Sequence, residues 1–331
     1  PASPMETALP APPPPSRVGT MKITDTALYA EVIRRVDAGD GYYPAVTTLQ
    51  RDNGAPVRPF VAVRLPTLAM IEAALGPTGT QAVALALLAA NALAFLLLLR
   101  RSSFALPEQI TAAALVAGAG ALVFMPPLLV WHEIWAGLLL GLALAAMAAG
   151  RWQAALVPAA LALAIRELAL PFVLLALALA ILGRRRRESF AWAAVLLAFV
   201  VALAAHRFMV EAQLRPGDLA SPGWLGLRGP VAVVDSLHDL TLLGGLPRPL
   251  AYLSGLAPLL GWLALPPARA RFPVLFFTGY FVMLSLFARP DNYYWASLVL
   301  PAWFAGLALA PRGLAILVSR AMGHAPAPAP G

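Results

Sequence analysis

The sequence predicts an all-α protein, a polytopic transmembrane helix bundle of about nine membrane helices with loops on its outer face. Of the 331 residues, 60% are hydrophobic and only 12% are charged, whereas about a quarter of an ordinary soluble domain is charged. The apolar residues come in long runs, and in hydrocarbon a helix satisfies every backbone amide within such a run. Loops rich in arginine alternate with loops that lack arginine clusters, as expected for a chain that crosses a membrane repeatedly.

The apolar runs give the positions of the helices. Several of them approach the roughly 20 residues that span a bilayer. The central segments 152–165 and 168–182 are shorter, which indicates a tilted hairpin or a re-entrant feature. The predicted membrane helices are 80–99, 109–128, 134–149, 152–165, 168–182, 189–205, 247–264, 272–287 and 296–310.

These helices divide the chain into four parts. They are a disordered, proline-rich segment 1–20, a first outer loop 21–79 with short helices, the bundle 80–311 with its outer loop 206–246, and a cytoplasmic tail 312–331. No apolar run precedes residue 79. We therefore expect that a first transmembrane helix is missing, or that the following helix drives export of the outer loop.

The orientation follows from the basic loops. The arginine-rich loops lie on one predicted side of the membrane, and the positive-inside rule assigns that side to the cytoplasm. They contain Arg100-Arg101, Arg151, Arg184 to Arg187, and Arg269 with Arg271. The net charge of +8 is then a signal of topology, and we expect no nucleic-acid partner. The chain contains no cysteine, so it has no disulfide framework.

The strongest motif lies in the first outer loop. Thr24 or Asp25 is a candidate N-cap for a helix that continues through Tyr29-Ala30-Glu31. Gly39-Asp40 and the aromatic step Tyr42-Tyr43-Pro44 follow. Farther along, the basic steps are Arg58-Pro59 and Arg64-Leu65-Pro66.

This order resembles the first outer loop of the GT-C glycosyltransferases, such as the lipid A aminoarabinose transferases and the protein O-mannosyltransferases. In that family the loop's first acid is the catalytic base, and the resemblance assigns this role to Asp25. Gly39-Asp40 corresponds to a second signature, and Arg64-Leu65-Pro66 stands where the family often has Lys-Pro-Pro. Thr26 stands where the family usually has a second acid.

The resemblance implies a membrane glycosyltransferase of the bacterial inner membrane with its active face in the periplasm. The donor would be a polyprenyl-phosphate sugar in the lipid bilayer, and the acceptor a glycan, a lipid or a protein. A carboxylate would remove the acceptor proton, and a single displacement would invert the anomeric centre. The departing phosphate needs Arg or His donors or a divalent cation, so the sequence leaves the cofactor open.

Other polar residues fall on the same predicted face. His132-Glu133 lies at an outer turn, Arg166-Glu167 interrupts a long apolar stretch, and His206 ends a helix. Charges at membrane depth are costly and usually functional. The candidate catalytic residues are Asp25, Asp40 and Glu133, and the candidate substrate- or phosphate-binding residues are Arg58, Arg64, His132, Arg166, Glu167, His206, Arg289, Asp291, Tyr42 and Tyr43.

Structural roles compete with each of these assignments. Asp25 can cap a helix, and Asp40 suits a Gly-Asp-Gly turn. Tyr42 and Tyr43 suit an interfacial belt, and Glu133 suits the N-terminal dipole of a helix. At the level of function, a transporter or flippase for a lipid-linked or anionic substrate and a non-catalytic assembly subunit stay open as alternatives.

Overall fold

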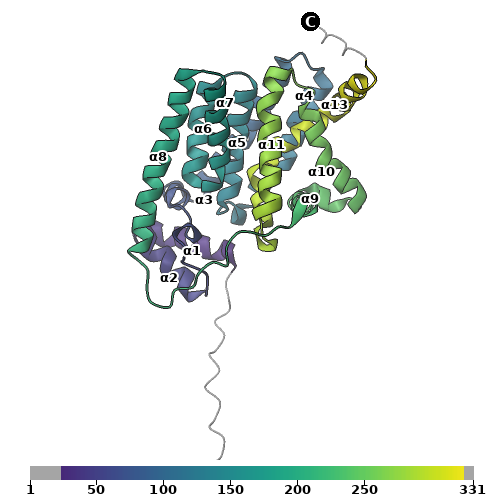
Figure 1. Ribbon diagram of the computed structural model, residues 1–331. Coiled ribbons are helices and arrows are strands. Elements are labelled where there is room, and N and C mark those ends of the chain that lie inside the picture. The colour runs from purple at the N-terminus through teal and green to yellow at the C-terminus, as the bar shows by residue number, and fades with distance from the viewer. Residues whose placement is uncertain (1–23, 324–331) are drawn as a thin grey trace, which may run out of the picture.

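The computed structural model describes residues 24–323, and within this range the fold is all-helical, as the sequence predicts (Figure 1). A small group of helices at one end of the molecule leads into a long bundle. The predicted proline-rich segment 1–20 and residues 324–331 of the predicted tail 312–331 lie outside the described residues.

The first outer loop folds into α1 (Asp25–Asp37), α2 (Tyr42–Asp52) and the short helix η1 (Phe60–Ala62). Helix α1 is amphipathic and buries Leu28 and Val32, one turn apart. These side chains belong to a small hydrophobic core of their own: Leu28, Val32, Tyr42, Val46, Leu49, Val57, Val63, Ala69 and Val210. We call α1, α2 and η1 with this core the outer unit, after its predicted side of the membrane. Val210 of α8 (Arg186–Glu211) fixes the outer unit to the bundle.

Helix α3 (Thr67–Arg100) joins the outer unit to the bundle, and it is kinked. Gly76 has φ +64°, a left-handed conformation that favours glycine, and Pro77 follows it. The part of α3 before the kink contributes Ala69 to the core that holds α1 and α2, and the part after it is the first long apolar helix of the bundle.

The remaining helices form the bundle around α5, whose residues are buried along nearly its whole length. Glycines allow close approach, because a Cβ on Gly137 of α5 would lie 2.1 Å from the Ser297 carbonyl oxygen. The bundle elements are α4 (Leu106–Ala119), η2 (Ala121–Phe124), η3 (Pro126–Leu128), α5 (His132–Ala148), α6 (Trp152–Ile165), η4 (Glu167–Ala169), α7 (Leu170–Leu182), α8 (Arg186–Glu211), α9 (Gly229–Asp239), η5 (Leu242–Gly245), α10 (Arg248–Trp262), α11 (Pro267–Phe287), η6 (Pro290–Leu298), α12 (Leu300–Trp303) and α13 (Ala305–Ala321).

Four stretches among the described residues are long and apolar enough to cross a membrane: Phe60–Arg100, Arg186–Glu211, Pro267–Phe287 and Leu300–Ala321. Helices α5, α6 and α7 are apolar but shorter. The count of about nine membrane helices thus stays a prediction. The predicted run 109–128 is interrupted, because α4 ends at Ala119 and the chain continues in short 3₁₀ turns. Helix α13 continues past residue 311, to Ala321.

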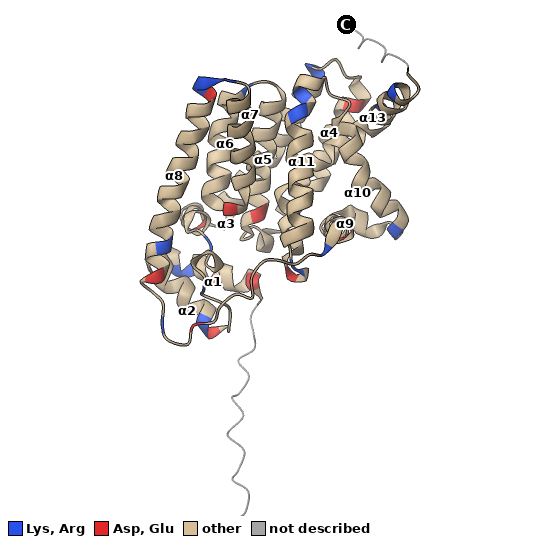
Figure 2. Ribbon diagram, viewed as in Figure 1, with Lys and Arg blue, Asp and Glu red and all other residues tan. Residues whose placement is uncertain are grey.

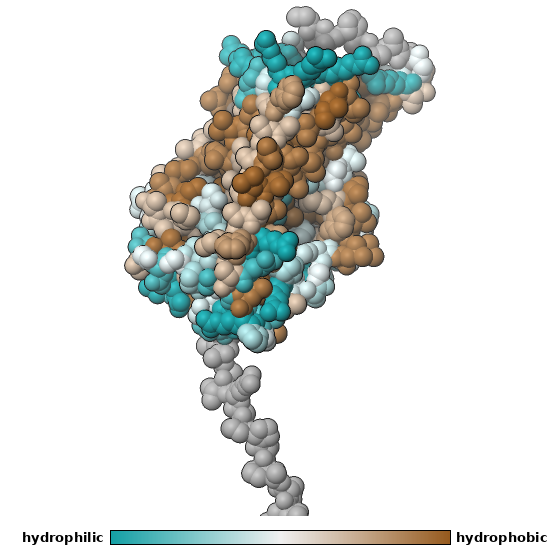
Figure 3. All heavy atoms as spheres, turned by 60° about the vertical axis from the view of Figure 1, so that its left-hand side comes forward, coloured by the Kyte–Doolittle hydropathy of each residue, from teal (hydrophilic) through white to brown (hydrophobic). Residues whose placement is uncertain are grey.

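Charge and hydropathy are distributed as a membrane protein requires. Arginines gather at the end of the bundle where α8 and α11 begin, whereas the opposite end carries acidic and basic residues together (Figure 2). Between the two ends the visible surface is dominated by hydrophobic residues (Figure 3). Figures 2 and 3 therefore agree with the alternation of loops in the sequence; the cytoplasmic assignment of the arginine-rich end stays a prediction.

Candidate functional site

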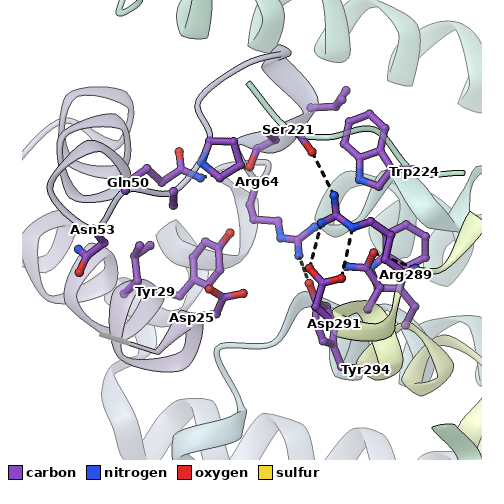
Figure 4. Close-up of a pocket in the computed structure, with 18 residues that line it drawn as sticks. Asp25, Tyr29, Gln50, Asn53, Arg64, Ser221, Trp224, Arg289, Asp291 and Tyr294 are labelled. Atoms are coloured by element: carbon purple, nitrogen blue, oxygen red, sulfur yellow. Dashed lines mark hydrogen bonds and ion pairs between the residues drawn. The ribbon is translucent and has the colours of Figure 1, made fainter. Parts of the chain in front are cut away.

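A polar cavity of about 350 Å³ lies between the outer unit and the bundle (Figure 4). We call it the polar cavity. One wall carries Asp25 and Tyr29 of α1, the other carries Arg289 and Asp291, and Arg64 lies between them. Segments far apart in the sequence thus meet here.

Asp25 is held in the first turn of α1 and faces the polar cavity. The N-cap is Thr24, whose hydroxyl oxygen accepts a hydrogen bond from the Ala27 N–H at 3.3 Å. Asp25 is therefore free of the capping role, and its exposed carboxylate makes no hydrogen bond or ion pair with any described residue. A carboxylate that is open to a cavity and not committed to a cation is available to accept a proton.

Tyr29 lies one turn after Asp25 on the same face of α1 and is a site residue that was not predicted from the sequence. Burial raises the pKa of its hydroxyl to about 12, so the group stays protonated at neutral pH. The spacing of four residues was the signal that could have found it, since such residues are neighbours on a helix.

Arg64 lines the polar cavity and two further cavities. Its Nη2 donates to the Tyr294 hydroxyl at 3.0 Å and lies 3.7 Å from Oε1 of Glu133. Its guanidinium also lies over the ring of Tyr29, 5.9 Å from the centroid. The Tyr42 hydroxyl donates to the Arg64 backbone carbonyl at 2.7 Å, which holds the residue in place.

The second cavity, of about 310 Å³, is lined by His132 and is called the His132 cavity. Asp25 and Tyr29 also line it, so it adjoins the polar cavity. The His132 ring is buried and packs edge-on against Tyr29, with centroids 5.6 Å apart, and its Nε2 has no hydrogen-bond partner among the described residues.

The third cavity, of about 360 Å³, is lined by Arg166 and is called the Arg166 cavity. Its other lining residues include Glu167 at the bundle end and the apolar side chains of Met283 and Phe287 from α11. Phe287 is 43% exposed on the surface of the bundle, so the wall of this cavity reaches the hydrophobic exterior.

Arg166 is 2% exposed and is paired on both sides. Its Nε donates to Glu133 Oε1 at 2.6 Å, and its Nη1 donates to Glu167. The guanidinium also lies 5.9 Å from the ring centroid of Trp295. Glu133 thus bridges Arg64 and Arg166. Its carboxylate, a predicted catalytic group, positions two cations here and is less free to accept a proton than Asp25.

Arg289 and Asp291 pair on the wall opposite Asp25, with Nη2 and Oδ2 at 3.1 Å. Arg289 Nη1 also donates to the Gly223 carbonyl at 3.0 Å and contacts Ser221 Oγ at 3.5 Å. The outer loop 206–246 is thereby fastened over the cavity. Trp224 of that loop lines both the polar and the Arg166 cavities, and sequence reasoning missed it because nothing local marks it.

Five predicted site residues do not line these three cavities: Asp40, Tyr42, Tyr43, Arg58 and His206. Asp40 is exposed in the turn after α1. His206 is buried, with Nε2 3.1 Å from the Val63 carbonyl oxygen and Nδ1 3.3 Å from the Tyr43 hydroxyl. Arg58 donates to the Arg215 carbonyl at 3.2 Å. The contacts of His206 and Arg58 attach the outer unit to α8 and the loop after it.

No group of three or more His, Asp or Glu side chains suited to hold a metal ion occurs among residues 24–323. The requirement for a divalent cation therefore stays open. Comparisons of this chain with models of protein families, with curated proteins and with solved structures gave no match.

Proposed function

We propose that this protein is a membrane glycosyltransferase that moves a sugar from a polyprenyl-phosphate donor to a glycan, lipid or protein acceptor at the outer leaflet. A bacterial inner membrane with the site on the periplasmic side is part of the proposal. The support comes from the first-loop resemblance and from the arrangement of three adjoining cavities around Arg64.

One observation carries the proposal: Arg64 lies where a polar cavity meets an apolar one. The Arg166 cavity offers an apolar wall for a lipid chain at Met283 and Phe287. The polar cavity offers room for a sugar beside Asp25, whose carboxylate forms no ion pair with any described residue. A lipid phosphate between the two would meet Arg64 and Arg166, and guanidinium groups bind phosphate with charge-assisted hydrogen bonds.

In this mechanism Asp25 accepts the proton of the acceptor hydroxyl. The acceptor oxygen then forms a bond to the anomeric carbon, while the bond from that carbon to the phosphate oxygen breaks. The electron pair of the broken bond leaves on the phosphate, where Arg64 and Arg166 stabilise the developing charge. Attack from the side opposite the phosphate inverts the anomeric centre.

The test is transfer by the purified full chain in lipid nanodiscs, with a panel of polyprenyl-phosphate pentoses and hexoses. Asp25→Asn removes the base while keeping the shape of the side chain. We expect it to lower kcat by about 10²–10⁴-fold, because that is the usual contribution of a positioned base. Asp52→Asn is the matched control, since Asp52 is an exposed acid at the end of α2 and lines none of the three cavities.

Unchanged transfer by Asp25→Asn would exclude Asp25 as the base. Equal losses in Asp25→Asn and Asp52→Asn would point to a general effect of charge on the outer unit. Absence of transfer by the wild-type chain from every donor in the panel would contradict the proposed activity itself.

A further inference from the structure

A fourth cavity, of about 540 Å³, lies on the other side of α1 from the polar cavity, and we call it the Glu72 cavity. Its walls come from α1, from α3 around the Gly76-Pro77 kink, and from the segment 126–130. Most of its lining is apolar, including Ala30, Ile33 and Pro127. It is large enough for a small amphipathic molecule.

Glu72 is the unusual residue of this wall. It is 6% exposed, and its Oε1 has no hydrogen-bond partner among the described residues. The single indole N–H of the neighbouring Trp135 is not available to this carboxyl, because it donates to the Leu129 carbonyl oxygen at 2.6 Å. Arg34 also lines the cavity, but its guanidinium is committed to both carboxylate oxygens of Glu31, at 2.7 and 2.6 Å. A buried carboxyl without a cation is costly in its ionised form, so it either keeps its proton or pairs with a positive charge.

The kink adds further acceptors beside Glu72. Pro77 has no N–H to donate to the carbonyl of Ala73, which lines the cavity. The Thr80 hydroxyl is buried and has no partner among residues 24–323, although a helical threonine usually bonds the carbonyl four residues earlier. That earlier residue is Gly76, whose backbone is not helical. The Glu72 carboxyl, the Ala73 backbone and the Thr80 hydroxyl therefore follow one another along about two turns of this wall.

We propose that the Glu72 cavity binds the ammonium group of an amphipathic primary amine. A primary ammonium has three N–H donors and one positive charge, which match the unpaired carboxylate and the neighbouring acceptors. The apolar part of the ligand packs on the alanine, isoleucine and proline walls. An anionic ligand would be repelled by Glu72, and an apolar one would leave its carboxylate buried and unpaired.

The position of the cavity indicates two sources for such an amine. It lies at the outer-unit end of the first long apolar helix, where lipid headgroups would meet the protein. The ammonium group can therefore come from an aminophospholipid of the bilayer or from a free alkylamine. The site uses neither Asp25 nor Arg64, so its test measures binding and does not depend on sugar transfer.

The experiment compares 4-fluorophenylethylammonium with 4-fluorophenylethanol, which has the same ring but no charge. Ligand ¹⁹F relaxation is measured with the full chain in phosphatidylglycerol nanodiscs, after subtraction of empty nanodiscs. We expect saturable binding of the ammonium and at least tenfold weaker binding of the alcohol. Glu72→Gln should weaken the ammonium at least tenfold and leave the alcohol unchanged.

Two further variants serve as controls for the result with Glu72→Gln. Asp52→Asn removes an exposed acid of the same unit and should leave binding unchanged. Ala30→Leu fills the cavity from the α1 side while Glu72 stays intact, and it should weaken the ammonium even if Glu72→Gln fails to fold. Equal binding of the two ligands by the wild-type chain would overturn the proposal. So would full ammonium binding by a folded Glu72→Gln or Ala30→Leu variant.

A last arm distinguishes the two sources. Phosphatidylethanolamine replaces part of the phosphatidylglycerol in the nanodiscs. Competition with the ammonium probe that rises with the phosphatidylethanolamine fraction would assign the site to the lipid headgroup. An unchanged affinity would assign it to a free amine.

Discussion

At the residue scale, some charged groups of the candidate site are paired with an opposite charge and others are not. Glu133 is held between Arg166 and Arg64, at 2.6 and 3.7 Å, whereas Asp25 has no ion pair among the described residues. The sequence placed both acids on one predicted face but could not separate their roles. The partners of Glu133 come from segments more than 30 residues away, and only folding decides which acid receives a cation.

The buried ion pairing of Arg166 leads to a prediction about the stability of the fold. In Arg166→Met, Glu133 keeps its charge in a buried position and loses its closest cation. We expect a loss of about 3–5 kcal/mol, because a buried charge without its partner is strongly destabilising. Thermal unfolding of the detergent-solubilised chain measures it. Adding Glu133→Gln to Arg166→Met should recover part of the loss.

The control for this prediction is Arg207→Met, since Arg207 forms an exposed pair with Glu211 at 2.7 Å on α8. Exposed pairs contribute at most about 1 kcal/mol. A loss in Arg166→Met no larger than the loss in Arg207→Met would show that the buried network does not stabilise the fold.

At the element scale, the outer unit is fastened to the loop after α8 by one ion pair. Nε and Nη2 of Arg51 on α2 donate to the two carboxylate oxygens of Asp218, at 2.6 and 3.0 Å. These bonds, with a further one from the Arg215 N–H, lower the pKa of Asp218 to about 2. The pair positions the loop that carries Trp224 over the polar cavity.

This pKa gives the sign of a pH dependence. The folded pKa of Asp218 lies below the unfolded value of about 3.9, so its stabilising contribution is complete above about pH 5. The contribution is lost as the pH falls from about 4 to about 2. The difference in unfolding temperature between wild type and Asp218→Asn should be constant from pH 7 to pH 5 and shrink below pH 4. A difference that does not change down to pH 2.5 would contradict the prediction.

Helix packing gives a second prediction at this scale. In Gly137→Ala the new Cβ would lie 2.1 Å from the Ser297 carbonyl oxygen, so α5 and η6 must move apart. We expect a loss of about 1–3 kcal/mol from overpacking, seen as a lower unfolding temperature. Gly118→Ala in α4 is the matched control, because its Cβ would meet nothing within 4 Å. A control that is as destabilised as Gly137→Ala would refute the packing argument.

At the scale of the whole molecule, the arginine-rich end and the mixed-charge end give the chain a direction (Figure 2). The cavities lie at the mixed end, with the outer unit, and α13 runs to the arginine-rich end. The positive-inside rule predicts that the cavities face away from the cytoplasm.

Because the sequence contains no cysteine, a single introduced cysteine can be labelled without reaction at native thiols, and this makes the orientation testable. Asp52→Cys reports on the outer unit, and Met322→Cys reports on the end of α13, where the native side chain is 61% exposed. In cells with a permeabilised outer membrane, a membrane-impermeant maleimide should label Asp52→Cys. Met322→Cys should react only after lysis. The reverse pattern would place the cavities in the cytoplasm.

The sequence by itself determined the helical class, the apolar segments, the division of charge between loops, and the start of a helix at Thr24 or Asp25. These depend on composition and on local spacing, which act over a few residues. The tertiary structure decided that Thr24 caps α1, that Glu133 is committed to two arginines, and that His206 attaches the outer unit to the bundle. It also identified Trp224 and Tyr294 as residues that line the polar cavity, and it revealed the Glu72 cavity. Burial and ion pairing depend on which distant segments meet in the folded chain, and a local sequence pattern does not contain that information.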